Sequence, residues 1–131
     1  MGCDIHAMME RRVARHDGWD EWVNAGAPRC NGHRNYLLFA CLADVRNCYD
    51  AVPIHAPRGV ARGVNAAFSA WRKIWDGDAH HDSWVTLAEA RAYVPPSLGA
   101  DSWAELVEDM DRVKRPGDTD DDVRIVFFFD N

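Results

Sequence analysis

Apolar and polar positions alternate over residues 3–13, at the start of the chain. The odd-numbered side of this segment is apolar and the even-numbered side is mostly polar: Cys3, Ile5, Ala7 and Met9 against Asp4, His6, Met8 and Glu10. A period of two predicts a strand, because successive side chains of a strand point to opposite faces of a sheet. A turn signal at residues 16–18 and a strand-like segment at 19–24 follow, so we expect a β-hairpin over the first 24 residues.

The strand-like alternation stops at Asn35. The segment NYLLFACLADV that begins there contains good helix formers and is apolar almost all round, which predicts a buried helix with Asn35 as its N-cap. Residues 46–63 hold two prolines and two glycines and are expected to form an irregular loop, which is uncommon at this length unless it has a function. Asn65 is expected to cap a second helix, whose apolar positions recur at helical spacing: Val64, Phe68, Trp71 and Trp75.

Two capping-box patterns mark helices in the second half of the chain. The box from Thr86 to Glu89 predicts a short helix that stops before the prolines at 95–96, and the box from Ser102 to Glu105 predicts a longer helix that ends at residues 116–117. The polar segment DGDAHHDS at residues 76–83 is expected to be a loop. The acidic stretch DTDDD at residues 118–122 is expected to be a solvated turn.

The last segment, VRIVFFFD, is β-branched and aromatic on both sides, which predicts a strand covered on both faces. We expect this strand to pair with the N-terminal hairpin. The fold class is therefore predicted to be α+β, with a small, mostly antiparallel sheet made of the hairpin and the C-terminal strand and with three to four helices inserted between them. The 131 residues fit a single domain, 1–131.

Composition and charge exclude several classes of protein. The net charge of −6 disfavours a protein that coats nucleic acid, because such binding needs a basic surface. No apolar run approaches the roughly 20 residues that a membrane helix needs, and no secretory signal is visible at the N-terminus. The four cysteines match no disulfide framework, so we expect reduced thiols and a cytoplasmic location.

Two polar clusters are candidates for a divalent metal site. Asp4, His6 and Glu10 share one face of the first predicted strand, and the segment at 76–83 adds three carboxylates and two imidazoles. Imidazoles and carboxylates ligate divalent metals or act as general acids and bases near neutral pH. We expect Asp4, His6 and one of two neighbouring histidines, His80 in the first instance, to hold the ion. The candidate catalytic groups are Glu10, Asp78 and His81. The alternatives are a solvated polar strand face and an ordinary polar loop.

Arginines and aromatic residues suggest a site for a phosphorylated small molecule. Arg34 precedes the predicted buried helix, Arg46 follows it and Arg58 lies in the long loop. Guanidinium groups bind phosphate oxygens through paired hydrogen bonds, and Tyr36 or Trp84 could stack on a ligand ring. Surface ion pairs with the many carboxylates are the alternative for these arginines. A structural zinc site from Cys3-x-x-His6 and Cys30-x-x-His33 is disfavoured, since residues three apart in a strand point to opposite faces.

Five stretches together resemble a family of small proteins encoded by bacteriophages and prophages, which begin with the same six residues. The stretches are MGCDIH, RNYLLFACLADVRN, PRG, D-x-H-x-x-SW-x-TL and VFFFDN. The resemblance implies one domain and the cytoplasm of a bacterial host, and it carries no catalytic residue over. Where relatives read H-S-H-S-W, this chain reads HHDSW at residues 80–84.

These observations predict a metal-dependent hydrolase or phosphoesterase acting on a small nucleotide-like substrate. The divalent ion would activate water, and Arg34, Arg46 and Arg58 would hold the phosphate. Two alternatives stay open: a non-catalytic protein that sequesters a nucleotide signal of the host, and a factor that inhibits a host protein. The hydrolase depends on one spatial assumption, which is that the first strand and the segment at 76–83 meet in space.

Overall fold

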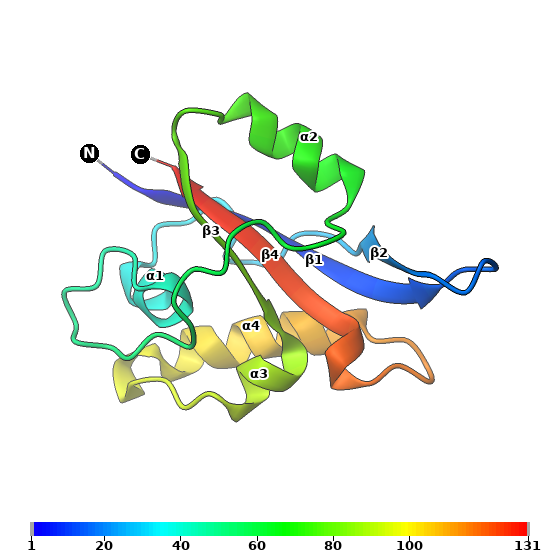
Figure 1. Ribbon diagram of the computed structural model, residues 1–131. Coiled ribbons are helices and arrows are strands. Elements are labelled where there is room, and N and C mark those ends of the chain that lie inside the picture. The colour runs from blue at the N-terminus through cyan, green and yellow to red at the C-terminus, as the bar shows by residue number, and fades with distance from the viewer. Residues whose placement is uncertain (1, 131) are drawn as a thin grey trace.

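A four-stranded antiparallel sheet forms the centre of the molecule (Figure 1). The computed structural model describes residues 2–130. The strands are β1 (Asp4–Ala14), β2 (Asp20–Asn24), β3 (Ala79–Thr86) and β4 (Val123–Asp130), in the order β2-β1-β4-β3. Strands β1 and β4 pair from Asp4 opposite Asp130 to Arg11 opposite Val123. The N-terminal hairpin, its pairing with the last strand and the α+β class are thus confirmed.

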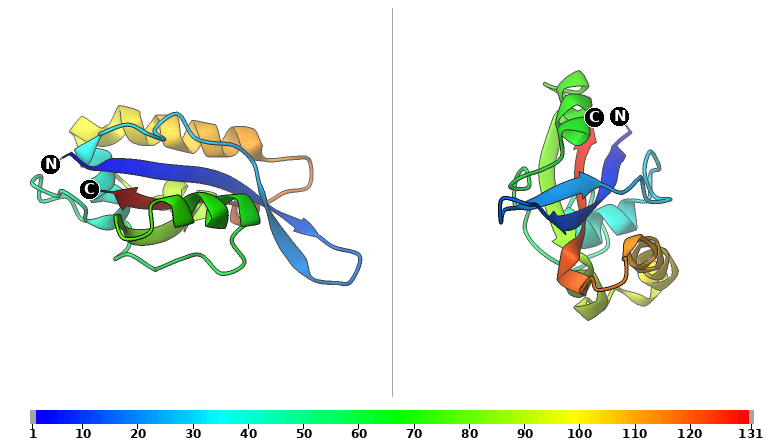
Figure 2. Two further views of the ribbon diagram at one scale, coloured as in Figure 1. Left: turned by 90° about the horizontal axis from the view of Figure 1, so that it is seen from above. Right: turned by 90° about the vertical axis from the view of Figure 1, so that its right-hand side faces the viewer.

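The helices cover both faces of the sheet (Figure 2). Helices α1 (Tyr36–Ala43), α3 (Leu87–Ala92) and α4 (Ala100–Val113) pack on one face, and α2 (Ala66–Ile74) lies across the other. Successive residues of β4 serve the two layers: Phe127 and Phe129 belong to the larger core, and Phe128 packs with Phe68 of α2 in the smaller one. This two-sided burial explains why the last strand is apolar at consecutive positions.

Local capping chemistry sets most of the helix starts. The side chain of Asn35 accepts a hydrogen bond from the backbone N–H of Leu38 (3.1 Å), and that of Asn65 accepts one from Phe68 (2.9 Å). The capping box from Thr86 to Glu89 is also formed. The predicted cap at Ser102 is wrong, because a short 3-10 turn leads into α4 at Ala100 and the hydroxyl of Ser102 instead accepts a hydrogen bond from Asn35 Nδ2 (2.9 Å).

The segment at 76–83 is a loop only over its first three residues, so the prediction for residues 79–83 is wrong. Strand β3 begins at Ala79 and forms an edge of the sheet. Its register shifts between His80 and Ser83, and His81 has a φ of 55°, in the left-handed region. A β-bulge of this kind interrupts the alternation of side chains, which is why a polar edge strand resembled a loop.

Irregular segments cover the edges of the sheet. Residues 25–32, here called the edge segment, run beside β1: the N–H of Met9 donates to the carbonyl of Gly26 (2.7 Å), and the N–H of Gly32 donates to that of Ile5 (2.8 Å). On the other side, the N–H of Gly59 donates to the carbonyl of Asp82 in β3 (2.8 Å). These contacts satisfy backbone groups that would otherwise be left unpaired.

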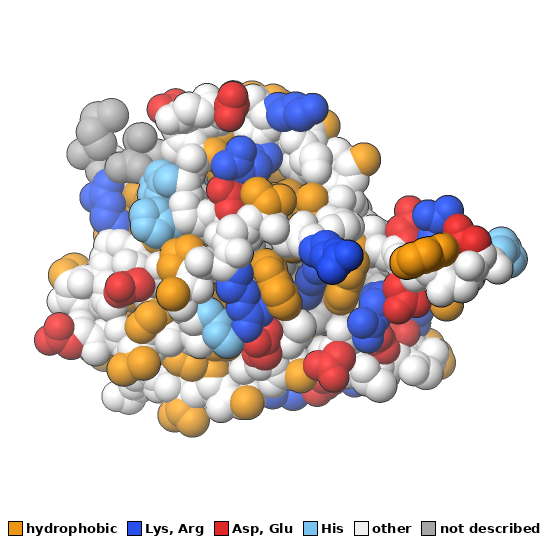
Figure 3. All heavy atoms as spheres, in the orientation of Figure 1, with side chains coloured by type: hydrophobic (Ala, Val, Ile, Leu, Met, Phe, Trp, Pro, Cys, Tyr) orange, Lys and Arg blue, Asp and Glu red, His pale blue; other side chains and the backbone are white. Residues whose placement is uncertain are grey.

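The acidic stretch at 118–122 is an ion-pairing element and not the solvated turn that was predicted. Asp118 pairs with Arg11, Asp120 with Lys114 and Asp122 with Arg12. Elsewhere on the face shown in Figure 3, basic side chains also lie among acidic ones. Across residues 2–130, no helix has both the length and the apolar character needed to span a membrane.

Candidate functional site

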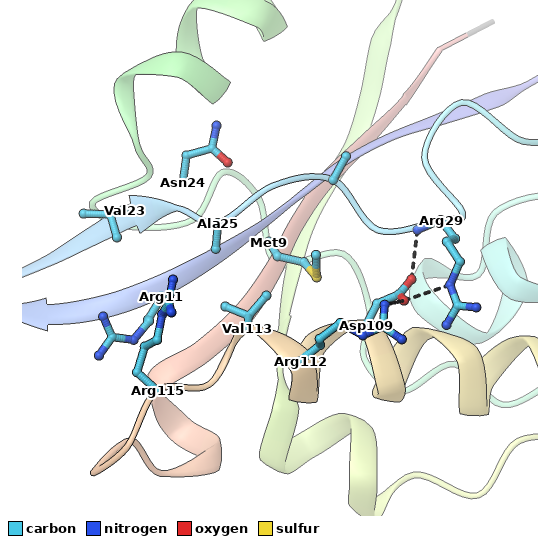
Figure 4. A pocket seen from close by; sticks show the side chains of 11 residues that line it. Met9, Arg11, Val23, Asn24, Ala25, Arg29, Asp109, Arg112, Val113 and Arg115 are labelled. Carbon is cyan, nitrogen blue, oxygen red and sulfur yellow. Dashed lines mark hydrogen bonds and ion pairs between the residues drawn. The ribbon is translucent and has the colours of Figure 1, made fainter.

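An arginine-lined groove of about 440 Å³ lies between β1, the edge segment and the C-terminal half of α4 (Figure 4). Four arginines, Arg11, Arg29, Arg112 and Arg115, and a single carboxylate, Asp109, line it. Met9, Val23 and Val113 provide apolar surface between the charged groups. We call this hollow the arginine groove. Figure 4 shows Arg11 and Arg115 at one end of it and Arg29, Asp109 and Arg112 at the other.

Strand periodicity brings Arg11 into the groove. Arg11 follows Met9 on the same face of β1, beyond the end of the apolar core. Its Nε and Nη2 atoms donate to the two carboxylate oxygens of Asp118 at 2.5 and 2.9 Å. The hydrogen bond from Arg11 lowers the pKa of Asp118 to about 2, so this carboxylate is ionised at neutral pH. Within residues 2–130, Nη1 of Arg11 makes no hydrogen bond and can donate to a ligand.

A buried carboxylate fixes the opposite end of the groove. Asp109 of α4 is 4% exposed and accepts hydrogen bonds from the backbone N–H (2.9 Å) and Nε (2.8 Å) of Arg29. Arg112 lies one helical turn along and pairs with both Asp109 and Glu108. The hydrogen bonds between Arg29 and Asp109 thereby attach the edge segment to α4. Nε of Arg112 has no hydrogen-bond partner among the described atoms. The ion pairs hold the guanidinium groups in place before any ligand arrives.

Arg115 differs from the other three arginines. It lies just beyond the end of α4, where its backbone N–H donates to Asp118 (2.8 Å). Its side chain is exposed and forms neither an ion pair nor a hydrogen bond with any residue from 2 to 130. A guanidinium group offers five N–H donors in one plane, a geometry that matches phosphate and carboxylate oxygens. Within the described part of the chain, the groove therefore contains one arginine without a side-chain partner beside three that are partly paired.

Guanidinium groups and apolar side chains make up most of the lining of the groove. Among the described residues that line the arginine groove there is no His, Cys, Ser, Thr or Tyr, and its carboxylate already accepts hydrogen bonds from Arg29. Nearby Cys30 is also unsuited to reaction, since burial raises the pKa of its thiol to about 12. What the groove can do is hold an anion with several guanidinium groups at once.

The predicted metal ligands are divided between the two faces of the sheet. His6 lies on the α2 face, where Nε2 is hydrogen bonded to Asp130 and the ring contacts Trp71, Trp75 and Phe128. His80 lies beside Phe129, whose side chain points into the other core. Asp4 is paired with Arg34 at 2.6 Å. The structure thus brings Asp4, His6 and Asp130 to one end of the sheet. We call these three residues and Arg34 the terminal cluster. His80 does not lie with them.

The predicted catalytic residues also lie apart. Glu10 is fully buried and accepts hydrogen bonds from Arg124 Nε (2.6 Å) and from the backbone and side-chain nitrogens of Asn65 (2.7 and 2.8 Å), so it anchors the start of α2. Asp78 is exposed in the turn before β3. His81 is exposed at the bulge, with its Nδ1 atom 2.6 Å from Nδ1 of His80. In residues 2–130, no three His, Cys, Asp or Glu side chains are arranged to hold a metal ion.

Four of the five predicted ligand-binding residues form two separate pairs, and the fifth, Arg34, is paired with Asp4. Arg46 lies over the ring of Tyr36 (5.5 Å to the centroid) near the start of α1. Arg58 lies over Trp84 (4.1 Å) and is ion-paired with Glu89. Burial alone would raise the pKa of Glu89, but the hydrogen bonds from Arg58 and the Thr86 backbone lower it to about 2. This pairing attaches the long loop to β3 and α3, which gives that loop a structural role.

Sequence reasoning missed all four arginines of the groove. They come from a strand, a loop and the end of a helix, and no local spacing connects them. Arg112 and Arg115 follow the common preference for cations at a helix C-terminus, which offers no sign of a ligand. Comparison of the chain with protein-family models, curated proteins and solved structures gives no match. The resemblance to phage proteins therefore stays a prediction, and the groove is interpreted from its own geometry.

Proposed function

We propose that the protein binds a small phosphorylated molecule in the arginine groove without transforming it. The observation that carries the proposal is the side chain of Arg115, which has no partner among residues 2–130 and lies in a groove with three other guanidinium groups. A diphosphate offers enough oxygens to engage Arg115 together with the spare donors of Arg11 and Arg112. The net charge of the chain is −6, which disfavours a long polyanion, whereas a small anion needs only the few guanidinium groups of the groove.

Titration calorimetry with inorganic pyrophosphate tests this proposal. We expect saturable binding by the wild-type protein and affinity that falls as salt is added, because the contacts are charge-assisted. Arg115→Ala should weaken binding about tenfold or more, the size of one lost hydrogen-bonded charge contact. Arg62→Ala is the matched control, since Arg62 is also exposed and lies outside the groove. Equal binding by the two variants, or no binding by the wild type, would refute the proposal.

One observation favours a second candidate, the metal-dependent hydrolase acting on a nucleotide-like substrate. Asp4, His6 and Asp130 lie at one end of the sheet on the same face, and two carboxylates with an imidazole are ligand types that divalent metals use. As they stand these three residues, all within the described part of the chain, are not arranged around a metal ion, so an ion would have to displace the pairings of Asp4 with Arg34 and of His6 with Asp130. Metal analysis of the purified protein, followed by an assay of phosphate release with added manganese or zinc, tests it. Stoichiometric metal that is lost in His6→Ala would support the hydrolase. Phosphate release that is unchanged in His6→Ala would reject it.

A further inference from the structure

A second hollow lies on the other side of the edge segment from the arginine groove. It has a volume of about 370 Å³ and is lined by Met8, Asn24, Gly26, Ala27, Asn31 and Trp71. Asn24 and Ala27 also line the arginine groove, so the two hollows share a wall. Met8 and Met9 point to opposite faces of β1, which places the second hollow on the α2 side. Figure 4 shows the side chain of Asn24 directed toward that side, away from the arginines.

Hydrogen bonding fixes the orientation of both asparagines in the second hollow. Oδ1 of Asn24 accepts from the backbone N–H of Gly26 (2.8 Å), and Oδ1 of Asn31 accepts from the backbone N–H of Ala7 (2.9 Å). The amide atom that faces each backbone N–H must be the oxygen, because only the oxygen accepts. The other amide atom of each side chain is therefore the Nδ2 donor. Neither Nδ2 atom makes a hydrogen bond to any residue from 2 to 130. The hollow thus offers two N–H₂ donors, and its asparagine oxygens are already engaged.

The remaining walls suit a flat ring. Trp71 is half-buried, and its indole is held by edge contacts with Phe68 and Phe128, at 6.1 and 5.9 Å between centroids. Met8 and Ala27 add apolar surface. An aromatic wall with apolar surface and a few fixed polar groups is typical of sites that hold heteroaromatic rings, and the volume lies in the usual range of about 300–1,000 Å³.

We infer that the second hollow binds the base of a purine nucleotide with a carbonyl group at C6, such as guanine, while its phosphates occupy the arginine groove. The inference rests on the proposed function. Guanine presents two acceptors on one edge, N7 and O6, and the hollow presents two donors. Adenine presents an acceptor and an amino donor on that edge, so its amino group would face an amide N–H₂ and lose a hydrogen bond. The asparagines therefore select for guanine against adenine.

Titration calorimetry with guanosine diphosphate, adenosine diphosphate and inorganic pyrophosphate tests the inference. We expect the guanine nucleotide to bind about tenfold or more tightly than the adenine nucleotide, and to bind more tightly than pyrophosphate. Asn24→Asp and Asn31→Asp keep the acceptor for the backbone N–H and remove the donor. N7 accepts in both purines, so only the asparagine whose donor faces position 6 distinguishes them. One of the two variants should therefore bring the preference for guanine to near unity, and the other should weaken both nucleotides to a similar extent. Pyrophosphate serves as the control for the added negative charge, since it lacks the base that would occupy the second hollow.

The outcomes separate the two proposals. Pyrophosphate binding with equal affinity for the two nucleotides would overturn the base assignment and leave the arginine groove as a phosphate site. A guanine preference that persists in both Asn→Asp variants would also overturn it. Absence of binding by pyrophosphate and by both nucleotides would refute the proposed function, and the base assignment would fall with it. Circular dichroism and thermal melting of each variant establish that it is folded, and the two single variants provide independent tests.

Discussion

The terminal cluster and the arginine groove both gather charged side chains at the border of the sheet, but they differ in what those side chains bind. In the terminal cluster, Asp4 pairs with Arg34 and His6 pairs with Asp130. The groove leaves Arg115 without a partner in residues 2–130. A protein can satisfy its own charges at low cost when the groups lie close together in the fold. An unsatisfied guanidinium in a groove is thus a better guide to a ligand than a dense cluster that is already paired.

Glu10 is the most deeply buried carboxylate that is paired inside the fold, so its removal should lower the free energy of unfolding more than any other change proposed here. Glu10→Ala leaves Arg124 buried without its carboxylate and removes the acceptor at the start of α2. We expect the free energy of unfolding to fall by about 3–5 kcal/mol. Denaturant titration measures it. Glu21→Ala is the control, because Glu21 is exposed on β2, and its loss should stay within about 0.5 kcal/mol. A loss below about 1 kcal/mol for Glu10→Ala would contradict a structural role.

The ion pair between Glu89 and Arg58 should make the free energy of unfolding depend on pH. The pKa of Glu89 is lowered to about 2 from its ordinary value of 4.5, so its contribution is complete above pH 4.5 and disappears as the pH falls toward 2. At pH 6, Glu89→Gln should lower the free energy of unfolding by about 2 kcal/mol. The difference between wild type and variant should vanish near pH 2. A difference that stays constant from pH 6 to pH 2 would show that the ionised form is not what stabilises the fold.

Arg115 should show the opposite behaviour, a loss of binding without a loss of stability. Because its side chain has no partner among the described residues, Arg115→Ala should leave the free energy of unfolding within about 0.5 kcal/mol of wild type. The affinity of the Arg115→Ala variant for pyrophosphate should nevertheless be about tenfold lower than that of the wild type. Thermal melting and calorimetry on the same sample check both halves. A clear loss of stability would mean that Arg115 has a structural role like that of Arg124.

The parts of this structure that follow from the sequence are those set by local chemistry. The caps at Asn35, Asn65 and Thr86 and the alternation of β1 depend on neighbouring residues, and all were predictable. Strand β3 was missed because its bulge at His81 breaks the alternation.

Partners that are distant along the chain were not predictable. The alternation of β1 placed Glu10 on the same face as His6, but Arg124, the partner of Glu10, lies 114 positions away. The groove combines residues from a strand, the edge segment and the region of α4 in the same way. Sequence alone showed which charges were unusual. Only the fold shows which of them are already paired.

Nuclear magnetic resonance of the arginine side chains tests the central claim most directly, because it reports where an anion binds and does not depend on a stability change. The Nε–H signals would be followed during titration with pyrophosphate and assigned by single Arg→Lys variants. The account predicts saturable shifts of the Arg115 and Arg11 signals, with those of Arg34 and Arg58 unchanged. Shifts confined to the Arg34 or Arg58 signals, with the Arg115 signal unchanged, would contradict this account. They would place the anion site at residues that the sequence analysis predicted.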